Sequence, residues 1–487
     1  MSGTSLPREP EAAHRALEEI QDLLGRLRVE AELVHREQHP AEPDRQALVQ
    51  QLVAKQQQNT LAARIAPLHA ADIAYVLEAL PPEQREFLWP LVPESRHGEV
   101  LIEIGQPVRG PLLEQMSRSA LIHMAQSLDT DDLAAMAEEL PFDVVERVRQ
   151  GLSIEEREQL RAAMSYPEDS VGARMDFEMV TIRDDVSLEV VLRYLRRFEA
   201  LPDHTDQVFV VDRKEHLQGA LSIDQLLLNE PETLVADVMR RDLLSLNAKD
   251  DAFEAAQAFQ RYDLVSAPVV DDQGKLIGRL TVSEVVDVIR EESDSDVLAQ
   301  AGLREEEDLF ASVWASARNR WLWLALNLCT AFFASRVIGA FEGTIEKVVA
   351  LAALMPIVAG IAGNSGNQTM TIFIRSMALG QVTPGNLARL FAKELSIAGL
   401  NGLVWGGVAG LFAWWLYAGS EHGPLLGLTM MMAILLNLLI AALIAIFVPM
   451  LLQKLGRDPA LGASVLLTFS TDSMGFFIFL GLASLLF

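Results

Sequence analysis

The last third of the chain contains five apolar stretches separated by short connections. An α-helix needs about 20 residues to cross the hydrocarbon core of a bilayer, and each stretch reaches that length. The stretches are 321–341, 348–378, 395–418, 425–452 and 460–486. We therefore predict a transmembrane domain of five helices over residues 319–487.

The charge of the 487-residue chain is distributed unevenly. Only 8 of its 40 basic and 6 of its 67 acidic residues lie from residue 319 onward, so the net charge is −29 before that point and +2 after it. An acidic soluble region attracts cations and repels nucleic acid and anionic lipid head groups. We therefore expect a soluble region distinct from the membrane domain, and no nucleic-acid partner.

Basic residues predict the orientation in the membrane. Arg336 and Lys347 flank one side of the predicted bundle. The other side has seven flanking basic residues: Arg318, Arg320, Arg375, Arg389, Lys393, Lys454 and Arg457. The positive-inside rule then places the soluble domains in the cytoplasm and the C-terminus outside, in a multi-pass protein of a bacterial-type cytoplasmic (inner) membrane. The first residues lack the apolar region of a secretory signal, and the single cysteine, Cys329, allows no disulfide framework.

The soluble region contains two internal repeats. The segment "LHAADIAYVLEALP" (68–81) returns as "LDTDDLAAMAEELP" (128–141), which is typical of helices that end at a Leu-Pro pair. We predict a flexible N-terminus over 1–24 and a superhelical α-helical domain over 25–170. The second repeat pairs 207–227 with 266–286, where short β-branched runs are followed by a second strand and a helix.

This second repeat resembles a tandem pair of CBS domains over 171–290, each a β-α-β-β-α unit. The resemblance implies an adenine nucleotide such as ATP as a candidate ligand, with Ser222, Thr281 and Glu284 as candidate contacts. The acid that usually ends the binding motif is replaced by Gln225 in the first copy and is Glu284 in the second. A connecting helix over 291–318, acidic at its start, then leads to the first predicted span.

The second span, which contains "PIVAGIAGNSGNQTMTIF", carries polar and glycine residues at membrane depth. Polar groups in lipid are unfavourable unless they face a partner or water. Pro356 and the glycines are expected to weaken the helix and free backbone carbonyls. We interpret Asn364, Asn367 and Gln368, with Gly363 and Gly366, as the lining of a hydrated cation path. The alternative is that the amides form helix–helix hydrogen bonds.

Asp472 is the one ionisable residue in the fifth span. A lone carboxylate at this depth needs a stabilising partner, and no basic residue of the other spans lies at a matching depth. We interpret its partner as a passing cation, or as a second Asp472 across a twofold axis with a cation between them. The neighbouring hydroxyls include Thr468 and Thr471. Oxygen ligands without nearby His or Cys favour Mg²⁺, Ca²⁺, Mn²⁺ or a monovalent ion.

Several segments together resemble the MgtE family of magnesium transporters. They are "YPEDSVGARM" (166–175), the CBS pair, the acidic connecting helix, "MPIVAGIAGNSGNQT" and "TDSMGFFIFLGLA", in the order of the family. One departure is Ala362, where the family commonly has glycine. The resemblance implies a homodimer whose pore is lined by spans two and five, with Asp472 in the ion filter. It also implies that Mg²⁺ bound to the acidic soluble domains closes the pore through the connecting "plug" helix.

The acids beside the plug and in the soluble domains are candidate regulatory Mg²⁺ ligands. They are Asp458, Glu291, Glu292, Asp294, Asp296, Asp250, Asp251, Asp72 and Glu78. Asp458 stands in "RDPA", so it is equally suited to cap the last span.

Three functions remain as alternatives at this point. The first is a Mg²⁺-selective, Mg²⁺-gated channel, and the second is a proton- or sodium-coupled transporter that uses the same pore residues. The third is a membrane-anchored CBS sensor, which leaves Asp472 and the Gly-Asn run unexplained. The chain has no G-x-x-x-x-G-K-[ST] motif, so we predict neither a primary pump nor an enzyme.

Overall fold

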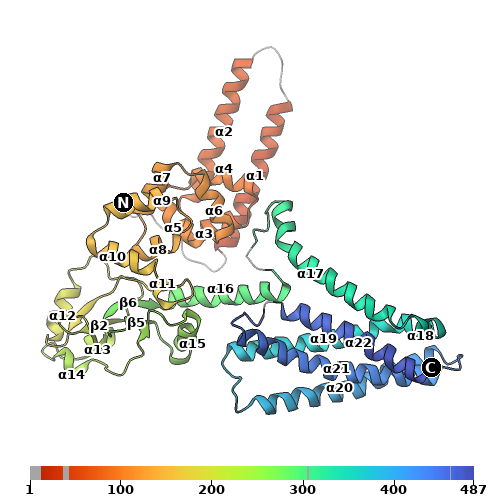
Figure 1. The fold of residues 1–487 in the computed structure, drawn as a ribbon. Coiled ribbons are helices and arrows are strands. Elements are labelled where there is room, and N and C mark those ends of the chain that lie inside the picture. Colours follow the sequence, from red (N-terminus) through yellow and green to blue (C-terminus); the bar gives the residue numbers. More distant parts are fainter. Residues whose placement is uncertain (1–11, 37–42, 304–306, 461) are drawn as a thin grey trace. The chain divides into compact units, whose positions relative to one another are not determined.

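The structure is a computed structural model, and it describes residues 12–36, 43–303, 307–460 and 462–487. The chain divides into two compact units (Figure 1). The first comprises residues up to 292 together with 308–310, and the second comprises 293–307 and 311–487. The fold class predicted from the sequence is confirmed: a helical domain, a CBS pair and a bundle of apolar helices follow one another.

The first unit begins with a domain of short helices. A pair of long helices, α1 (Ala12–Arg36) and α2 (Pro43–Ile65), packs side by side at its start (Figure 1). The elements that follow are α3 (Ala70–Glu78), α4 (Pro82–Leu88), the 3₁₀ turns Trp89–Leu91 and Glu94–Arg96, α5 (His97–Glu103), α6 (Gln106–Gln115), α7 (Arg118–Gln126), α8 (Thr130–Met136), α9 (Phe142–Gly151), α10 (Ile154–Ala163) and α11 (Val171–Arg174).

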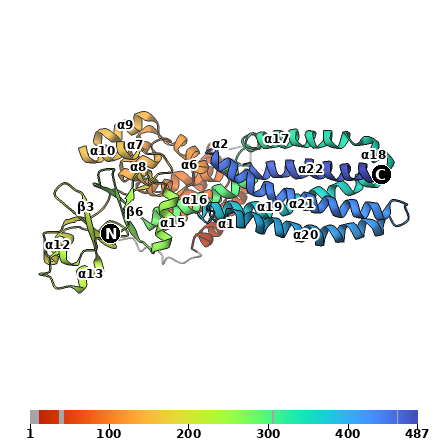
Figure 2. The ribbon, with the colours of Figure 1, turned by 60° about the horizontal axis from the view of Figure 1, so that its bottom comes forward.

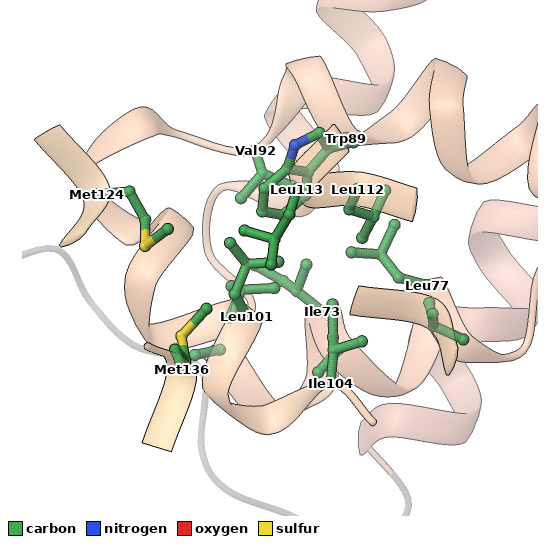
Figure 3. Packing of buried hydrophobic residues seen from close by; sticks show 14 of the residues in the cluster. Ile73, Leu77, Trp89, Val92, Leu101, Ile104, Leu112, Leu113, Met124 and Met136 are labelled. Carbon is green, nitrogen blue, oxygen red and sulfur yellow. The ribbon is translucent and has the colours of Figure 1, made fainter. Parts of the chain in front are cut away.

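The two sequence repeats of this domain form α3 and α8. Ile73 and Leu77 of α3 are almost fully buried, and they pack with Leu101, Ile104 and Leu112 in one core (Figure 3). Burying a leucine or isoleucine contributes about 1.5–3 kcal/mol, so this core orders the short helices that would be marginal alone.

Part of the segment predicted to be flexible is helical. The sequence predicts flexibility over 1–24, whereas α1 begins at Ala12 and buries Ile20 in the domain core. The part of that prediction that concerns residues 1–11 lies outside the described residues.

The CBS repeat forms two three-stranded sheets of the same topology. In each sheet the first strand is parallel to the second and the second is antiparallel to the third, and both second–third pairs shift register near their ends. The elements are β1 (Thr181–Arg183), α12 (Leu188–Leu195), β2 (Gln207–Val211), β3 (Leu217–Ser222), α13 (Ile223–Leu228), α14 (Val235–Val238), β4 (Leu246–Asn247), α15 (Ala252–Tyr262), β5 (Ser266–Val270) and β6 (Leu276–Thr281).

The connecting segment differs from the single helix predicted over 291–318. Helix α16 (Val282–Ala301) continues from the second CBS sheet and ends at Gly302, whose φ of +78° is left-handed. Helix α17 (Val313–Gly339) then begins at Ser312, whose hydroxyl caps the helix by accepting a hydrogen bond from the Ala315 amide. The first apolar helix therefore starts well before residue 321.

The second unit is built from long helices that lie along one another (Figure 2). They are α17, the short α18 (Glu342–Lys347), α19 (Ala350–Ala378), α20 (Leu387–Leu416), α21 (Gly423–Lys454) and α22 (Ala463–Leu486). Among the described residues, α17, α20, α21 and α22 are long and apolar enough to span a membrane. Helix α19 has 29 residues and contains the polar run.

Helix α20 packs against α21 through Gly402, Gly406 and Gly410, which recur at every fourth position. A Cβ atom at Gly410 would lie 2.5 Å from the Gly427 carbonyl oxygen, and one at Gly406 would lie 2.9 Å from the Met431 carbonyl oxygen. The absence of side chains therefore lets the two backbones approach closely.

Candidate ion pathway and regulatory acids

The polar run of α19 is continuous helix. The sequence predicts a weakened helix around Pro356 and the glycines, but helical structure extends from Ala350 to Ala378 without a break. Of the glycines in the run, Gly366 permits close packing on neighbouring helices, whereas Gly363 makes only an ordinary contact. A Cβ atom at Gly366 would lie 2.9 Å from Leu467 Cδ1, and one at Gly363 would lie 3.6 Å from Thr471 Oγ1.

The amide side chains of α19 point away from these packed faces. Asn364, Asn367 and Gln368 are all exposed within the second unit. Asn364 and Gln368 line a cavity of about 510 Å³ between α19 and α20, which also includes Asn401 and the apolar Trp405. The structure thus places two of the three predicted amides in one cavity, and Asn367 is not among its lining residues.

Asp472 is partly buried on α22 between two buried residues, Thr471 and Ser473. Among the described residues, none forms a hydrogen bond or an ion pair with its carboxylate. The Ser473 hydroxyl is buried, and it too lacks a hydrogen-bond partner in the described part of the chain. Two polar groups at adjacent positions are therefore left without protein partners inside an apolar helix, where such groups are unfavourable.

The predicted hydroxyl ligands are bound to their own helix. Thr468 Oγ1 donates to the Ser464 carbonyl at 2.9 Å, and Thr471 Oγ1 donates to the Thr468 carbonyl at 3.1 Å. Each hydroxyl oxygen still has lone pairs that can accept a hydrogen bond from water.

Asn437 of α21 is a buried polar residue that sequence reasoning missed. Its Nδ2 donates to the Val358 carbonyl of α19 at 3.3 Å and to the Thr471 carbonyl of α22 at 3.1 Å. It therefore joins the two helices that carry the polar run and Asp472. The signal was present, because Asn437 is the one amide inside the long apolar stretch 425–452.

Trp323 of α17 is a second missed residue. Its ring packs against Gly302, at the end of α16, and against Gly462, directly before α22. Both glycines have positive φ, at +78° and +79°, so a larger residue would be strained as well as crowded. The tryptophan thereby joins the end of the connecting helix to the start of the helix that bears Asp472.

Asp296 and Asp458 lie close enough to repel each other. Asp296 is on α16, and burial together with the charge of Asp458 raises the pKa of its carboxyl. Asp458 Oδ1 also accepts a hydrogen bond from the Ala460 amide at 2.8 Å. The capping role expected for Asp458 is not confirmed, because α22 begins at Ala463 with Gly462 as its N-cap. The Asp458 carboxylate instead closes a local turn before the helix, near Asp296.

Several other predicted regulatory acids make structural contacts. Glu78 Oε1 accepts from the Gly105 amide at 2.8 Å, Asp250 Oδ2 accepts from the Asn247 amide at 2.9 Å, and Asp251 caps α15. Glu291 pairs with Arg174 through both carboxylate oxygens. Asp72 lies in the first turn of α3, and Glu292 and Asp294 lie on α16.

A larger group of acids, unforeseen from the sequence, gathers in the first unit. Burial, followed by the charges of Asp132, Asp176 and Asp129, raises the pKa of Asp131 to about 7. Burial and neighbouring acids, including Asp129 and Glu284, raise the pKa of Asp132 to about 6. These residues are distant in sequence, so the group exists only after folding. In the described part of the chain, no three His, Cys, Asp or Glu side chains are arranged to hold a metal ion.

The residues predicted to contact a nucleotide form hydrogen bonds with other residues of the protein. Glu284 Oε2 accepts hydrogen bonds from the Thr281 hydroxyl and from the Thr281 amide, the latter at 3.1 Å. Ser222 lies at the N-terminus of α13, beside Asp224, whose pKa is lowered chiefly by a hydrogen bond from that serine.

Together these features define a membrane protein in which a helical domain and a CBS pair precede a bundle of apolar helices that carries a polar run on α19. Family profiles agree with this class along the chain. The MgtE divalent cation transporter profile matches residues 355–482, the MgtE intracellular N domain profile matches 68–169, and the CBS domain profile matches 235–291.

Curated relatives extend the match over most of the chain. The magnesium transporter MgtE of Thermus thermophilus is 31% identical over 443 residues, which cover 89% of this chain and 97% of that protein. The magnesium transporter MgtE of Bacillus subtilis is 26% identical, covering 86% and 92%. The chain therefore belongs to the MgtE family, and the resemblance noted in its sequence is confirmed. A solved cytosolic domain of the Mg²⁺ channel MgtE in complex with ATP is 30% identical, with a TM-score of 0.43, and covers 50% of this chain and 98% of that one.

Proposed function

We propose that the chain forms a homodimeric, Mg²⁺-selective channel that admits Mg²⁺ to the cytoplasm down its electrochemical gradient. The observation that carries the proposal is the partly buried carboxylate of Asp472, to which no described side chain donates a hydrogen bond. Two copies across a twofold axis would bring two such carboxylates to one divalent ion, whose charge they balance. Mg²⁺ keeps most of its water, so such a site needs few direct ligands.

The polar face of α19 supports a hydrated path toward the cytoplasm. Asn364, Asn367 and Gln368 offer neutral amide oxygens, Gly366 lets α19 approach α22 closely, and Gly363 faces Thr471 of α22. Thr468 and Thr471 add hydroxyl oxygens on the helix of Asp472. Neutral oxygen groups can replace or bind hydration water without trapping the ion as a dense cluster of carboxylates would.

We further propose that all five long helices span the membrane, with the soluble domains in the cytoplasm and the C-terminus outside. The distribution of basic residues supports this orientation. In it, α19 runs inward and α22 runs outward, so Asp472 lies between the two ends of the pathway.

Regulation by Mg²⁺ is proposed on electrostatic grounds. Asp296 of the connecting helix and Asp458 near the start of α22 repel each other in the absence of a cation. A divalent ion between them would relieve the repulsion and hold the connecting helix against the membrane unit. A divalent ion would likewise relieve the repulsion among Asp131, Asp132 and their acidic neighbours. A ligand shifts such an equilibrium only through its preference for one state, so several weak sites can combine into a steep response.

We also propose that the CBS pair binds ATP through Ser222, Thr281 and Glu284. It is supported by the ATP complex of the similar cytosolic domain. The hydrogen bonds between Thr281 and Glu284 would have to rearrange if Glu284 contacted a ribose.

The alternative of a proton- or sodium-coupled transporter is less well supported. Secondary transporters commonly bind substrate at discontinuous helices, whereas α19 is continuous through its polar run. Coupling also predicts that Mg²⁺ flux follows an imposed proton or sodium gradient, and the channel predicts that it does not.

The test is electrical recording from the reconstituted full-length protein while cytosolic-side Mg²⁺ is varied. We expect a Mg²⁺ conductance that closes as cytosolic-side Mg²⁺ rises and that Asp472→Ala abolishes. Glu342→Gln, which removes an exposed carboxylate of α18, serves as the control and should conduct normally. Conductance retained in Asp472→Ala would refute the pathway.

A further inference from the structure

The contact between α19 and α20 is unusual within the bundle. Helix α20 packs on α21 through its glycines, whereas the cavity of about 510 Å³ separates it from α19 along much of their length. Asn364 and Gln368 face this cavity from α19, and Asn401 faces it from α20. The side of α19 that carries Asn364 and Gln368 therefore does not pack directly against α20.

One side-chain hydrogen bond links α19 to α20 within the described residues. Thr369 Oγ1 donates to Glu394 Oε2 at 3.2 Å. The Glu394 side chain is only 13% exposed, and its other oxygen lies 3.6 Å from Lys393 Nζ. A carboxylate accepts a stronger hydrogen bond than a neutral oxygen does, which suits it to hold two helices together where packing is sparse.

The hydrogen bond between Thr369 and Glu394 lies next to the polar run of α19. Thr369 directly follows Gln368, and Glu394 lies two helical turns before the cavity residue Asn401. A rotation of α19 about its axis would turn Asn364 and Gln368 away from the cavity, and it would also break the bond at Thr369. The bond is thus placed to fix the direction in which the amides point.

We propose that Glu394 is a positioning residue for ion passage: its carboxylate, through Thr369, holds the amides of α19 toward the cavity. The inference rests on the proposed channel function and adds a residue to it. Thr369 lies six residues beyond Gly363, which packs at Thr471, so the bond is about 9 Å along the helix from the level of Asp472. Its loss should therefore slow passage without altering ion binding at Asp472.

The test measures Mg²⁺ flux into liposomes containing the full-length protein, as a function of Mg²⁺ concentration. Thr369→Val and Glu394→Ala should each lower the maximal flux at least about threefold, the effect of losing one interhelical hydrogen bond in a membrane. The Mg²⁺ concentration for half-maximal flux should stay unchanged. The double variant should be no worse than either single one, because both remove the same bond.

Conservative variants separate positioning from charge. Glu394→Gln and Thr369→Ser keep an acceptor and a donor, so both should retain near-normal flux. Thr429→Val is the matched control, since Thr429 is buried but its hydroxyl bonds only to its own helix, at the Leu425 carbonyl. The proposal is overturned if Thr369→Val behaves as the wild type, or if Glu394→Gln is as slow as Glu394→Ala.

A second measurement does not depend on flux. With the single native cysteine removed by Cys329→Ser, Ser365→Cys places a thiol in the cavity. Thr369→Val should change its labelling rate by a water-soluble thiol reagent at least about threefold, and Glu394→Gln should not. An equal rate in all variants contradicts the proposal. Failure of the channel function itself is distinguishable, because wild-type protein would then carry no Mg²⁺ flux that Asp472→Ala abolishes.

Discussion

Arg85 and Asp308 form a buried ion pair although they stand 223 residues apart in the chain. Both belong to the first unit, and their side chains are 5% and 11% exposed. The Arg85 guanidinium binds both carboxylate oxygens and also donates to the carbonyls of Leu77 and Glu78, at 2.7 and 3.1 Å. Phe310 lies over the same guanidinium, 5.7 Å from ring centroid to Cζ.

We predict that Arg85→Ala destabilises this part of the helical domain by about 3–5 kcal/mol, because it leaves the buried Asp308 carboxylate without a cationic partner. Hydrogen exchange of the amides in α3 and α4 of the full-length protein would report the loss. Arg118→Ala is the control, since its pair with Asp143 is 62% and 66% exposed and should contribute less than about 1 kcal/mol. Equal exchange in the two variants would contradict the role given to Arg85.

The acids around Asp131 predict a dependence of stability on pH. The pKa values of Asp131 and Asp132 are raised to about 7 and about 6, so the folded state binds protons that the unfolded state has already released. Such groups stabilise the fold fully at low pH and lose that contribution as the pH rises through the folded pKa. Without divalent ions, thermal unfolding should therefore show the first unit less stable at pH 8 than at pH 5.

Asp131→Asn tests the origin of this pH dependence. The amide cannot ionise, so the variant should flatten the stability profile between pH 5 and pH 8 and be relatively more stable at the upper end. The exposed Asp237→Asn should leave the profile as in the wild type. A profile unchanged by Asp131→Asn would assign the pH dependence to other groups.

The apolar spans and the CBS repeat could be predicted from sequence because their signals are local. Hydropathy defines a spanning helix, and a β-branched run before a turn defines a strand, whatever lies elsewhere in the chain. The group formed by Asp131, Asp176 and Glu284 has no local signal, since its members meet only through tertiary packing.

The sequence prediction for the polar run of α19 is wrong for a different reason. Glycine and proline destabilise an isolated helix, so the sequence predicts a weakened one with freed carbonyls. In the bundle, the absence of a side chain at Gly366 allows close packing on Leu467 and Ala441, and that packing outweighs the low helix propensity. Propensity alone could not show which glycines face a neighbouring helix.

We therefore expect alanine substitutions at Gly366 and Gly360 of α19 to have opposite effects on stability. A Cβ atom at Gly366 would lie 2.9 Å from Leu467 Cδ1 and 3.2 Å from Ala441 Cβ, whereas one at Gly360 would meet nothing within 4 Å. Gly366→Ala should lower the stability of the bundle by about 1–3 kcal/mol through overpacking. Gly360→Ala should be neutral or stabilising by up to about 1 kcal/mol. Thermal unfolding in detergent would compare them, and a larger loss for Gly360→Ala would contradict the packing.

Asn437 should hold α21, α19 and α22 together through its two interhelical hydrogen bonds. Its side chain is fully buried, and a Cβ atom at Gly475 would lie 2.5 Å from Asn437 Nδ2, so α22 approaches the amide closely. Asn437→Leu removes both bonds and places a branched apolar group against Gly475. We expect the free energy of unfolding of the bundle to fall by about 1–2 kcal/mol, with a parallel loss of Mg²⁺ flux because α22 carries Asp472.

Asn327→Leu is the matched control for this prediction, since Asn327 is exposed on α17 and its side chain forms no hydrogen bond among the described residues. Thermal unfolding in detergent should leave Asn327→Leu near the wild type and lower the midpoint of Asn437→Leu. If instead Asn437→Leu unfolds at the wild-type temperature and conducts normally, packing alone holds the three helices. The amide would then be unnecessary for placing the Asp472 helix against the polar run of α19.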